Sequence, residues 1–341
     1  MIINKKFKNA LNNISQKTPP IWFMRQAGRY HNHYQSLRKK YKFVELCKQP
    51  ELAAEVACGP ITDFDYDVAI LFSDILFPLQ SLGLELNYSP GPVFGNYLND
   101  QLLNNLKPIS DILDDLSFQK EALNITRDML PNNKSLVGFV GGPWTLLSYG
   151  SGIKNEVSVP DIEENKFYER ALYEVLIPLT KQTIEIQLNN NAEIVYIFDT
   201  NARQMADKYF MEKYIKIVHE EIFQSFPNKV AYFRKENPLL KIKDSNKIYS
   251  MAGMVYGNST GLVNALKEKT SGFLQGNFSP ESLLKPHHEF KLDFEQFKNS
   301  LLSLTSEERS GWVCSLNHGV LPKSSEHNVK YFVDNIRQSF Q

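Results

Sequence analysis

The stretch Val68-Ala69-Ile70-Leu71-Phe72-Ser73-Asp74 is a continuous apolar run that ends in two polar residues. An apolar run without alternation, bounded by polar residues, is typical of a strand that is buried on both faces of a parallel sheet. Helical patterns flank it, over residues 30–64 before it and residues 111–130 after it. The stretch therefore predicts one strand of a fold in which strands and helices alternate.

The same unit recurs along the chain. We predict about eight strands, most of them followed by a helical pattern, at residues 21–24, 68–72, 135–140, 193–198, 229–233, 247–251, 272–275 and 312–316. Such alternation predicts parallel strands joined by right-handed crossovers. Because the composition shows no break that would mark a linker, we predict a single-domain (β/α)8 TIM barrel, of the α/β class, over residues 1–341, with residues 1–18 as an N-terminal arm or helix.

Composition and charge exclude several classes of function. Lys plus Arg and Asp plus Glu balance at 38 each, so the chain has no net charge to favour nucleic acid or an anionic membrane. The apolar runs are too short to span a bilayer. The three cysteines form no C-x-x-C pair, and the polar N-terminus shows no apolar segment of a secretory signal. We expect a cytoplasmic protein that binds neither nucleic acid nor a membrane.

Motifs for nucleotides and metals are absent or weak. No G-x-G-x-x-G follows a predicted strand, and no G-x-x-x-x-G-K-[ST] occurs. Cys314 and His318 are four residues apart, and His31 and His33 form a second candidate pair. Zinc needs three or four protein ligands, and no further Cys or His joins either pair at a recognised spacing. The sequence therefore predicts neither a metal site nor a cofactor.

Chemistry in a barrel takes place where the strands reach their carboxyl ends. Reading the residues at those positions gives a candidate site made of Arg25, Arg29, Asp74, Trp144, Tyr149, Asp199, Thr200, Asn317 and His318. Among them are cations, hydroxyls and a single isolated acid.

Two arginines follow the predicted strand at residues 21–24. Arg25 and Arg29 are separated in part by the small residues Ala27 and Gly28, which makes a compact cationic turn. A guanidinium offers a rigid fork of donors that suits a carboxylate or a phosphate. The turn is either a surface feature with two solvated arginines or the rim of an anion-binding cleft. The apolar residues Trp22 and Phe23 in front of it favour the cleft.

Asp74 is the only charge in the segment Ala-Ile-Leu-Phe-Ser-Asp-Ile-Leu-Phe-Pro-Leu, residues 69–79. A buried carboxylate is costly unless it finds hydrogen-bond donors, a cation or a proton. Asp74 could cap the turn that follows it. The functional alternative is an anion at the floor of a cleft, which would bind N–H donors or a positive charge that develops on a ligand.

The other strand-end residues have two readings each. The Tyr149 hydroxyl could hold a ligand carboxylate or make an ordinary buried hydrogen bond. Thr200 could contact a ligand, although either it or Asp199 could cap the next helix. His318 is a candidate catalytic group or a satisfied core residue.

Six segments of the chain, in this order, resemble the uroporphyrinogen decarboxylase family. They are WFMRQAGRY at residues 22–30, PELAAEV at 50–56, AILFSDIL at 69–76, GGPWTLLSY at 141–149, LQGN at 274–277 and LNHG at 316–319. The resemblance runs over nearly the whole chain. It implies a (β/α)8 barrel that acts without a cofactor and removes the acetate side chains of uroporphyrinogen III. The product would be coproporphyrinogen III, in haem biosynthesis, and family members commonly form homodimers.

The resemblance also implies roles for single residues. It places Arg25, Arg29 and Arg38 at substrate carboxylates, and Asp74 at the pyrrole N–H groups. Arg25 is in addition a candidate proton donor. The remaining substrate-binding positions that it implies are Gln26, Ala27, Gly28, Tyr149, Thr200 and His318.

The chain departs from the family pattern in three places. Asn317 stands where the family has glycine, Asn201 and Arg203 replace the usual residues after Asp199-Thr200, and Gly-Met-Val-Tyr occupies residues 253–256. The additional Arg203 could add to carboxylate binding. Two alternatives remain open: a cobalamin-linked methyltransferase of the same fold, a branch that uses zinc, and a tetrapyrrole-binding protein without catalytic activity.

Overall fold

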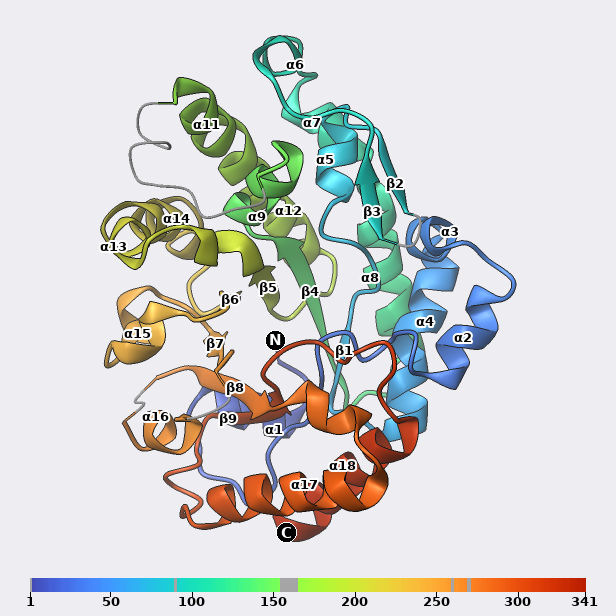
Figure 1. Cartoon of the computed structure of the whole chain (residues 1–341), viewed down its shortest axis with the longest axis vertical. Coiled ribbons are helices and arrows are strands. Elements are labelled where there is room, and N and C mark those ends of the chain that lie inside the picture. The colour runs from blue at the N-terminus through green and yellow to red at the C-terminus, as the bar shows by residue number, and fades with distance from the viewer. Residues whose placement is uncertain (1, 89–90, 154–164, 259–260, 269–270) are drawn as a thin grey trace.

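A parallel sheet that curls on itself forms the centre of the molecule (Figure 1). The computed structural model describes residues 2–88, 91–153, 165–258, 261–268 and 271–341. The sheet order is β1-β4-β5-β6-β7-β8-β9, and every pairing is parallel. The strands are β1 (Val68–Ile70), β4 (Ser135–Gly141), β5 (Val195–Phe198), β6 (Val230–Phe233), β7 (Gly253–Val255), β8 (Phe273–Phe278) and β9 (Trp312–Leu316).

The segment around Ile21 joins the two ends of this sheet. Ile21 makes a parallel bridge to Cys314 of β9, and the Cys314 N–H donates to the Pro20 carbonyl at 2.9 Å. On its other side, the Ile21 carbonyl accepts from the N–H of Asp67, just before β1, at 2.9 Å. This joining segment confirms the predicted TIM-barrel-like α/β fold.

Two predicted strands differ from the structure. The strand predicted at residues 21–24 is reduced to the single bridged residue Ile21, because the chain turns at Met24 and Arg25. The strand predicted at residues 247–251 is wrong: helix α15 (Ser245–Ile248) lies there, and β7 begins only at Gly253. The Phe273 ring of β8 packs where a Cβ on Gly253 would lie, at 2.4 Å, so only glycine fits this start of the strand.

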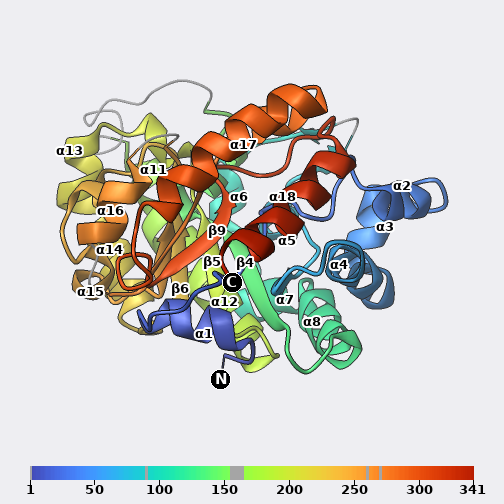
Figure 2. The same ribbon diagram turned by 90° about the horizontal axis from the view of Figure 1, so that it is seen from below.

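Helices surround the strands, as Figures 1 and 2 show from two directions. On the chain before β4 they are α1 (Lys5–Leu11), α2 (Asn32–Arg38), α3 (Phe43–Lys48), α4 (Pro50–Phe64), α5 (Phe77–Ser81), α6 (Asp100–Asn104), α7 (Ile109–Asp114) and α8 (Ser117–Met129). After β4 come α9 (Pro143–Gly150), α11 (Lys166–Arg170), α12 (Ile177–Asn189), α13 (Asp207–Tyr209), α14 (Ile215–Val218), α16 (Leu262–Glu268), α17 (His287–Leu302) and α18 (Glu326–Ser339). Among the described residues, no helix is both long enough and apolar enough to cross a membrane.

An excursion between β1 and β4 adds a second, small sheet. Strands β2 (Leu86–Tyr88) and β3 (Pro92–Phe94) pair antiparallel, and α6 follows them at the top of Figure 1. The hairpin is important for the site because it lies beside the strand ends.

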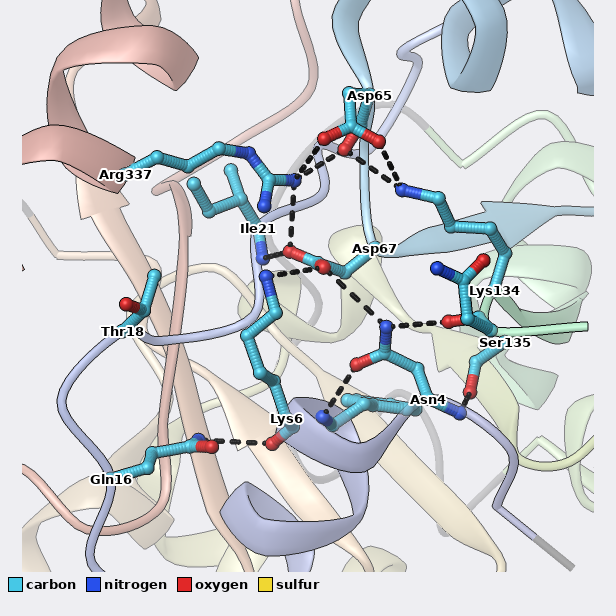
Figure 3. Close-up of polar contacts among 12 residues, drawn as sticks. Asn4, Lys6, Gln16, Thr18, Ile21, Asp65, Asp67, Lys134, Ser135 and Arg337 are labelled. Carbon is cyan, nitrogen blue, oxygen red and sulfur yellow. Dashed lines mark hydrogen bonds and ion pairs between the residues drawn. The ribbon is translucent and has the colours of Figure 1, made fainter. Parts of the chain in front are cut away.

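Asp67 holds the opposite, amino-terminal edge of the sheet together (Figure 3). Its side chain is 2% exposed and accepts from the Ile21 N–H at 2.8 Å. It also makes ion pairs with Lys6 at 2.7 Å and with Arg337 of α18 at 3.3 Å. Both the N-terminal and the C-terminal helix are thus fastened to the segment that joins the sheet. The contacts of Asp67 thus stabilise the amino-terminal end of the barrel, whereas active sites in barrels lie at the carboxyl ends of the strands.

Candidate functional site

The arginine turn is shaped by its backbone. Arg25 has a φ of 58°, a left-handed conformation that is uncommon for a residue with a side chain. Gln26 is almost fully buried and fixes the turn: its side-chain oxygen accepts from the Phe23 N–H at 3.2 Å, and its side-chain nitrogen donates to the Val68 carbonyl at 3.1 Å. The turn is therefore attached to β1, the strand that leads to Asp74.

The Arg25 side chain runs along the backbone at Gly319. A Cβ at Gly319 would lie 2.6 Å from the Arg25 Cδ atom, so the side chain can take this path only past a glycine. Its charge acts on two neighbours: it partly opposes the rise that burial causes in the Asp74 pKa, and it adds to the fall that burial causes in the His318 pKa. Arg25 therefore lies beside the Gly319 backbone and within electrostatic reach of Asp74 and His318.

Asp74 is half-buried at the end of the β1 run. Burial raises the pKa of its carboxyl group above the usual value, while the Leu76 N–H, the Tyr88 hydroxyl and Arg25 act in the opposite direction. The Leu76 N–H donates to Oδ1 at 2.9 Å, which is the local turn contact expected of an aspartate at a strand end. One carboxylate oxygen is therefore held by the backbone, and the electrostatic cost of the buried charge is only partly offset.

Tyr88 was not predicted as a site residue. It lies on β2, and its hydroxyl is buried with no well-formed hydrogen bond to any described residue, yet it is close enough to favour the charged form of Asp74. The Asp74 charge in turn contributes to a raised Tyr88 pKa, although burial is the larger cause. No spacing in the sequence indicates this contact, because it depends on the hairpin folding back over β1.

The surroundings of His318 favour the neutral form of its ring. Burial lowers its pKa, and the charges of Arg25 and Lys235 lower it further. Its ring meets the Phe233 ring of β6 edge-on, with centroids 5.9 Å apart. A neutral imidazole next to a guanidinium can accept a hydrogen bond from one partner and donate one to another.

Arg29 and Arg38 are exposed on the side of the site where α2 begins and ends. Burial raises the pKa of the Tyr34 hydroxyl, and the charges of Arg38 and Arg29 oppose this rise. Arg38 also opposes the rise in the Cys47 pKa, to which the nearby Asp74 charge contributes. Both cations therefore lie within electrostatic reach of Tyr34, and Arg38 also lies within reach of Cys47.

A cleft of about 610 Å³ occupies the part of the same edge that follows β4, β5 and β6. Its lining consists of Pro92, Val93, Phe94, Tyr97, Ser148, Tyr149, Gly152, Ile153, Asn201, Arg203, Gln204 and Glu236. Tyr149 is 36% exposed and its ring lies beside that of Phe94. Thr200 is half-buried and directly precedes the lining residue Asn201. Arg25, Asp74 and His318 do not line this cleft, so the predicted site residues fall into two groups at one edge of the sheet.

Asp199 supports the cleft from below. It is fully buried and accepts from the Thr145 N–H and hydroxyl, both at 2.9 Å, from the Tyr214 hydroxyl at 2.5 Å and from the Tyr232 hydroxyl at 3.0 Å. Burial raises the pKa of its carboxyl group, and these donors act in the opposite direction. The side chain connects β5, β6 and the first turn of α9, and thereby fixes the segments that carry Tyr149 and Thr200.

Of the candidate metal ligands of the sequence, His318 is part of this site, and His31 and Cys314 have different surroundings. The His31 ring nitrogen Nε2 lies 2.6 Å from Asp63, and Cys314 is buried with its pKa raised well above the usual value by that burial. Within residues 2–341, apart from the short stretches that the structure leaves undescribed, no group of three His, Cys, Asp or Glu side chains is arranged to hold a metal ion.

Comparison with known proteins shows similarity to one protein family over nearly the whole chain. The family model described as "Uroporphyrinogen decarboxylase (URO-D)" matches residues 3–339. A protein of Trichlorobacter lovleyi named uroporphyrinogen decarboxylase is 30% identical, over 99% of this chain and 100% of its own length. The protein of the same name from Orientia tsutsugamushi strain Ikeda is 34% identical, over 96% of both chains.

Among solved structures, a methyltransferase from Methanosarcina mazei superposes with a TM-score of 0.76 and covers 100% of both chains. Its sequence is 17% identical to this one. At that identity the likeness supports the barrel-like fold and carries no information on the reaction.

Proposed function

The chain belongs to the uroporphyrinogen decarboxylase family, and on this premise we propose that it converts uroporphyrinogen III to coproporphyrinogen III. In this proposal the acetate side chains are removed as carbon dioxide without a cofactor, in the cytoplasm, as a step of haem biosynthesis. One observation carries the proposal. The half-buried carboxylate of Asp74 has few hydrogen-bond donors around it, and it lies near Arg25 and His318 where the strands reach their carboxyl ends.

The substrate itself can supply the electron sink that decarboxylation needs. A proton added to the pyrrole carbon beside the acetate-bearing carbon turns the ring into a delocalised cation. The bond between the methylene carbon and the carboxylate then breaks and carbon dioxide leaves. The electron pair of that bond stays on the substrate and neutralises the cation. A second proton adds to the exocyclic carbon and the ring proton is lost, so that the acetate becomes a methyl group with a net uptake of one proton.

Asp74 would stabilise the cationic intermediate. A fixed anion in a site of low dielectric interacts strongly with charge that develops on a ligand. Its free carboxylate oxygen would accept the pyrrole N–H groups and so place the rings over the acid. Because burial raises the Asp74 pKa, binding of these donors would also offset the cost of keeping the carboxylate charged.

The cations would orient the carboxylates of the substrate. Arg25, Arg29 and Arg38 would bind them as charge-assisted pairs, and Arg25 would be the candidate proton donor. The side chain, the N–H and the carbonyl of Gln26 are all engaged within the protein, so Gln26 would shape this substrate-binding turn, while Ala27 and Gly28 would contact the substrate through their backbone. The further contacts proposed are Tyr149, Thr200 and His318.

Anaerobic incubation of the purified protein with uroporphyrinogen III tests this proposal. We expect products with successively fewer carboxyl groups, separated by chromatography after oxidation to porphyrins. Recovery of the substrate alone would refute the proposal, and tight binding without turnover would favour a tetrapyrrole-binding protein. The homodimer expected from the family can be checked by sedimentation of the same sample.

A methyltransferase is the alternative within this fold. The Methanosarcina mazei structure shows only that the same fold can serve a methyltransferase. Metal analysis of the purified protein and an assay for methyl transfer to a thiol distinguish the two reactions.

A further inference from the structure

The cleft at β4, β5 and β6 lies across the barrel mouth from the arginine turn. In the sheet order, β5 and β6 occupy the middle, whereas the Ile21 segment that leads to Arg25 joins the two ends. A ligand that reaches from Asp74 over the mouth of the barrel would therefore arrive at this cleft. Uroporphyrinogen carries carboxylates on all its rings, so its far side also needs cationic partners.

Arg203 is the arginine that lines this cleft. It lies on the 3₁₀ segment Thr200–Gln204 that follows β5, and it is exposed. Within the described part of the chain Arg203 has no hydrogen-bond or ion-pair partner. Its fork of donors is thus available to a ligand.

A second arginine near the same strand ends, Arg234, differs from Arg203 because its guanidinium is bound within the protein. Arg234 follows β6, is 2% exposed, and donates from both terminal nitrogens of its guanidinium to the protein. It donates to Asp207 at 2.9 Å and to the Glu236 carbonyl at 2.6 Å, and it lies over the Phe210 ring. Arg234 therefore has a structural role, and Arg203 does not.

The surroundings of Arg203 are built to hold their shape. The Asn201 N–H donates to the Thr145 hydroxyl at 3.0 Å, and its side-chain amide donates to the Ser148 hydroxyl at 3.0 Å. Gln204 accepts from the indole N–H of Trp144 at 3.2 Å. The segment that presents Arg203 is thus anchored on both sides of it, which reduces the entropy cost of binding.

We propose that Arg203, together with the hydroxyl of Tyr149, which lines the same cleft, forms a carboxylate-binding subsite for the side of the tetrapyrrole that lies away from Asp74. This inference rests on the proposed function for the identity of the ligand. The subsite binds substrate and does not touch the reacting acetate. Its loss consequently affects KM far more than kcat.

Glu236 lines the same cleft and provides the reciprocal test. Its carboxylate is exposed and forms no ion pair with Arg203. A like charge at the cleft disfavours a carboxylate ligand, so Glu236→Gln should bind the substrate more tightly. Lys208, an exposed cation on α13 outside the lining, serves as the matched control.

The experiment compares the wild type with Arg203→Gln, Arg203→Lys, Glu236→Gln and Lys208→Ala in anaerobic assays with uroporphyrinogen III. For Arg203→Gln we expect KM to rise about tenfold, as for loss of one charge-assisted pair, with kcat within about twofold. Arg203→Lys should fall between it and the wild type, Glu236→Gln should lower KM, and Lys208→Ala should leave it unchanged. High salt should reduce the difference between wild type and Arg203→Gln.

Three results would overturn the inference. They are an unchanged KM in Arg203→Gln, an equal rise in Lys208→Ala, and a loss confined to kcat. If the wild type does not decarboxylate, the proposed function fails separately, and equilibrium binding of uroporphyrinogen then judges the subsite. A weaker affinity in Arg203→Gln alone would still support it, and equal affinities would refute it.

Discussion

The backbone conformation of Arg25 and its packing against Gly319 fix the position of its guanidinium. The left-handed backbone and the contact with Gly319 hold the guanidinium within electrostatic reach of Asp74 and His318. The sequence predicts the three residues as strand-end groups but not their mutual influence. That influence depends on distances across the barrel mouth, which no spacing along the chain contains.

Arg25→Lys should reduce kcat/KM at least about tenfold although the charge is kept. Lysine has a point charge on a flexible stem, and it lacks the planar fork that binds a carboxylate through two parallel hydrogen bonds. Steady-state assays with uroporphyrinogen, alongside circular dichroism to confirm folding, measure the effect. Wild-type kinetics in a folded Arg25→Lys variant would contradict this role of the fork.

Tyr88 should set the pH at which activity is lost on the acid side. If Asp74 must be charged, kcat/KM falls as the pH drops through its pKa, which burial raises above the usual range. The Tyr88 hydroxyl favours the carboxylate, so Tyr88→Phe should raise the pKa and move the acid limb upward by about one pH unit or less. Tyr331→Phe, at a half-buried tyrosine of α18 that does not line the cleft, is the control. A limb that stays in place or moves to lower pH would show that Tyr88 does not act on Asp74.

Among the elements, those with the clearest sequence patterns are the ones predicted best. The buried strands at β1, β4, β5, β6 and β9 follow apolar runs that end in polar residues, and their predicted positions overlap the structure. The prediction fails at residues 247–251, where apolar residues belong to a short helix. The strand beyond it begins with Gly253, and glycine has a low strand propensity, so the true position gave a weaker signal.

The joining segment at Ile21 shows a second feature that the sequence did not predict. Its apolar residues predict a strand, but the structure uses one bridge, and its stability depends on Asp67 at the amino-terminal edge. Asp67 was not predicted to have any role. Its partners Lys6 and Arg337 lie near opposite ends of the chain, and only the fold brings them together.

Asp67→Asn should lower the free energy of unfolding by about 2–3 kcal/mol. The amide can still accept from the Ile21 N–H, but it leaves Lys6 and Arg337 without their buried partner, and these cations are themselves partly exposed. Glu174→Gln is the control, since Glu174 is 71% exposed and pairs with the partly exposed Arg170, and it should cost less than about 1 kcal/mol. Urea denaturation compares them, and equal losses in the two variants would contradict the account of this edge.

For the molecule as a whole, the barrel separates stability from chemistry. One edge of the sheet carries the ion pairs around Asp67, and the other carries the arginine turn, Asp74, His318 and the cleft. The class of fold and the family could be predicted from the sequence, because strand order and motif order are both properties of the chain. The Tyr88 contact and the shape of the cleft could not, because both depend on how the β2–β3 hairpin packs over the strand ends.

The central claim is that a fixed negative charge at Asp74 drives cofactor-independent decarboxylation. Asp74→Asn keeps the shape of the side chain and removes the charge, so substrate binding should persist while kcat falls by at least about a hundredfold. The measurement is the release of carbon dioxide from uroporphyrinogen III under anaerobic conditions, with the wild type and Asp74→Asn compared side by side. Loss of release in the variant with substrate still bound is the predicted result, and near-normal release from the variant would contradict the claim.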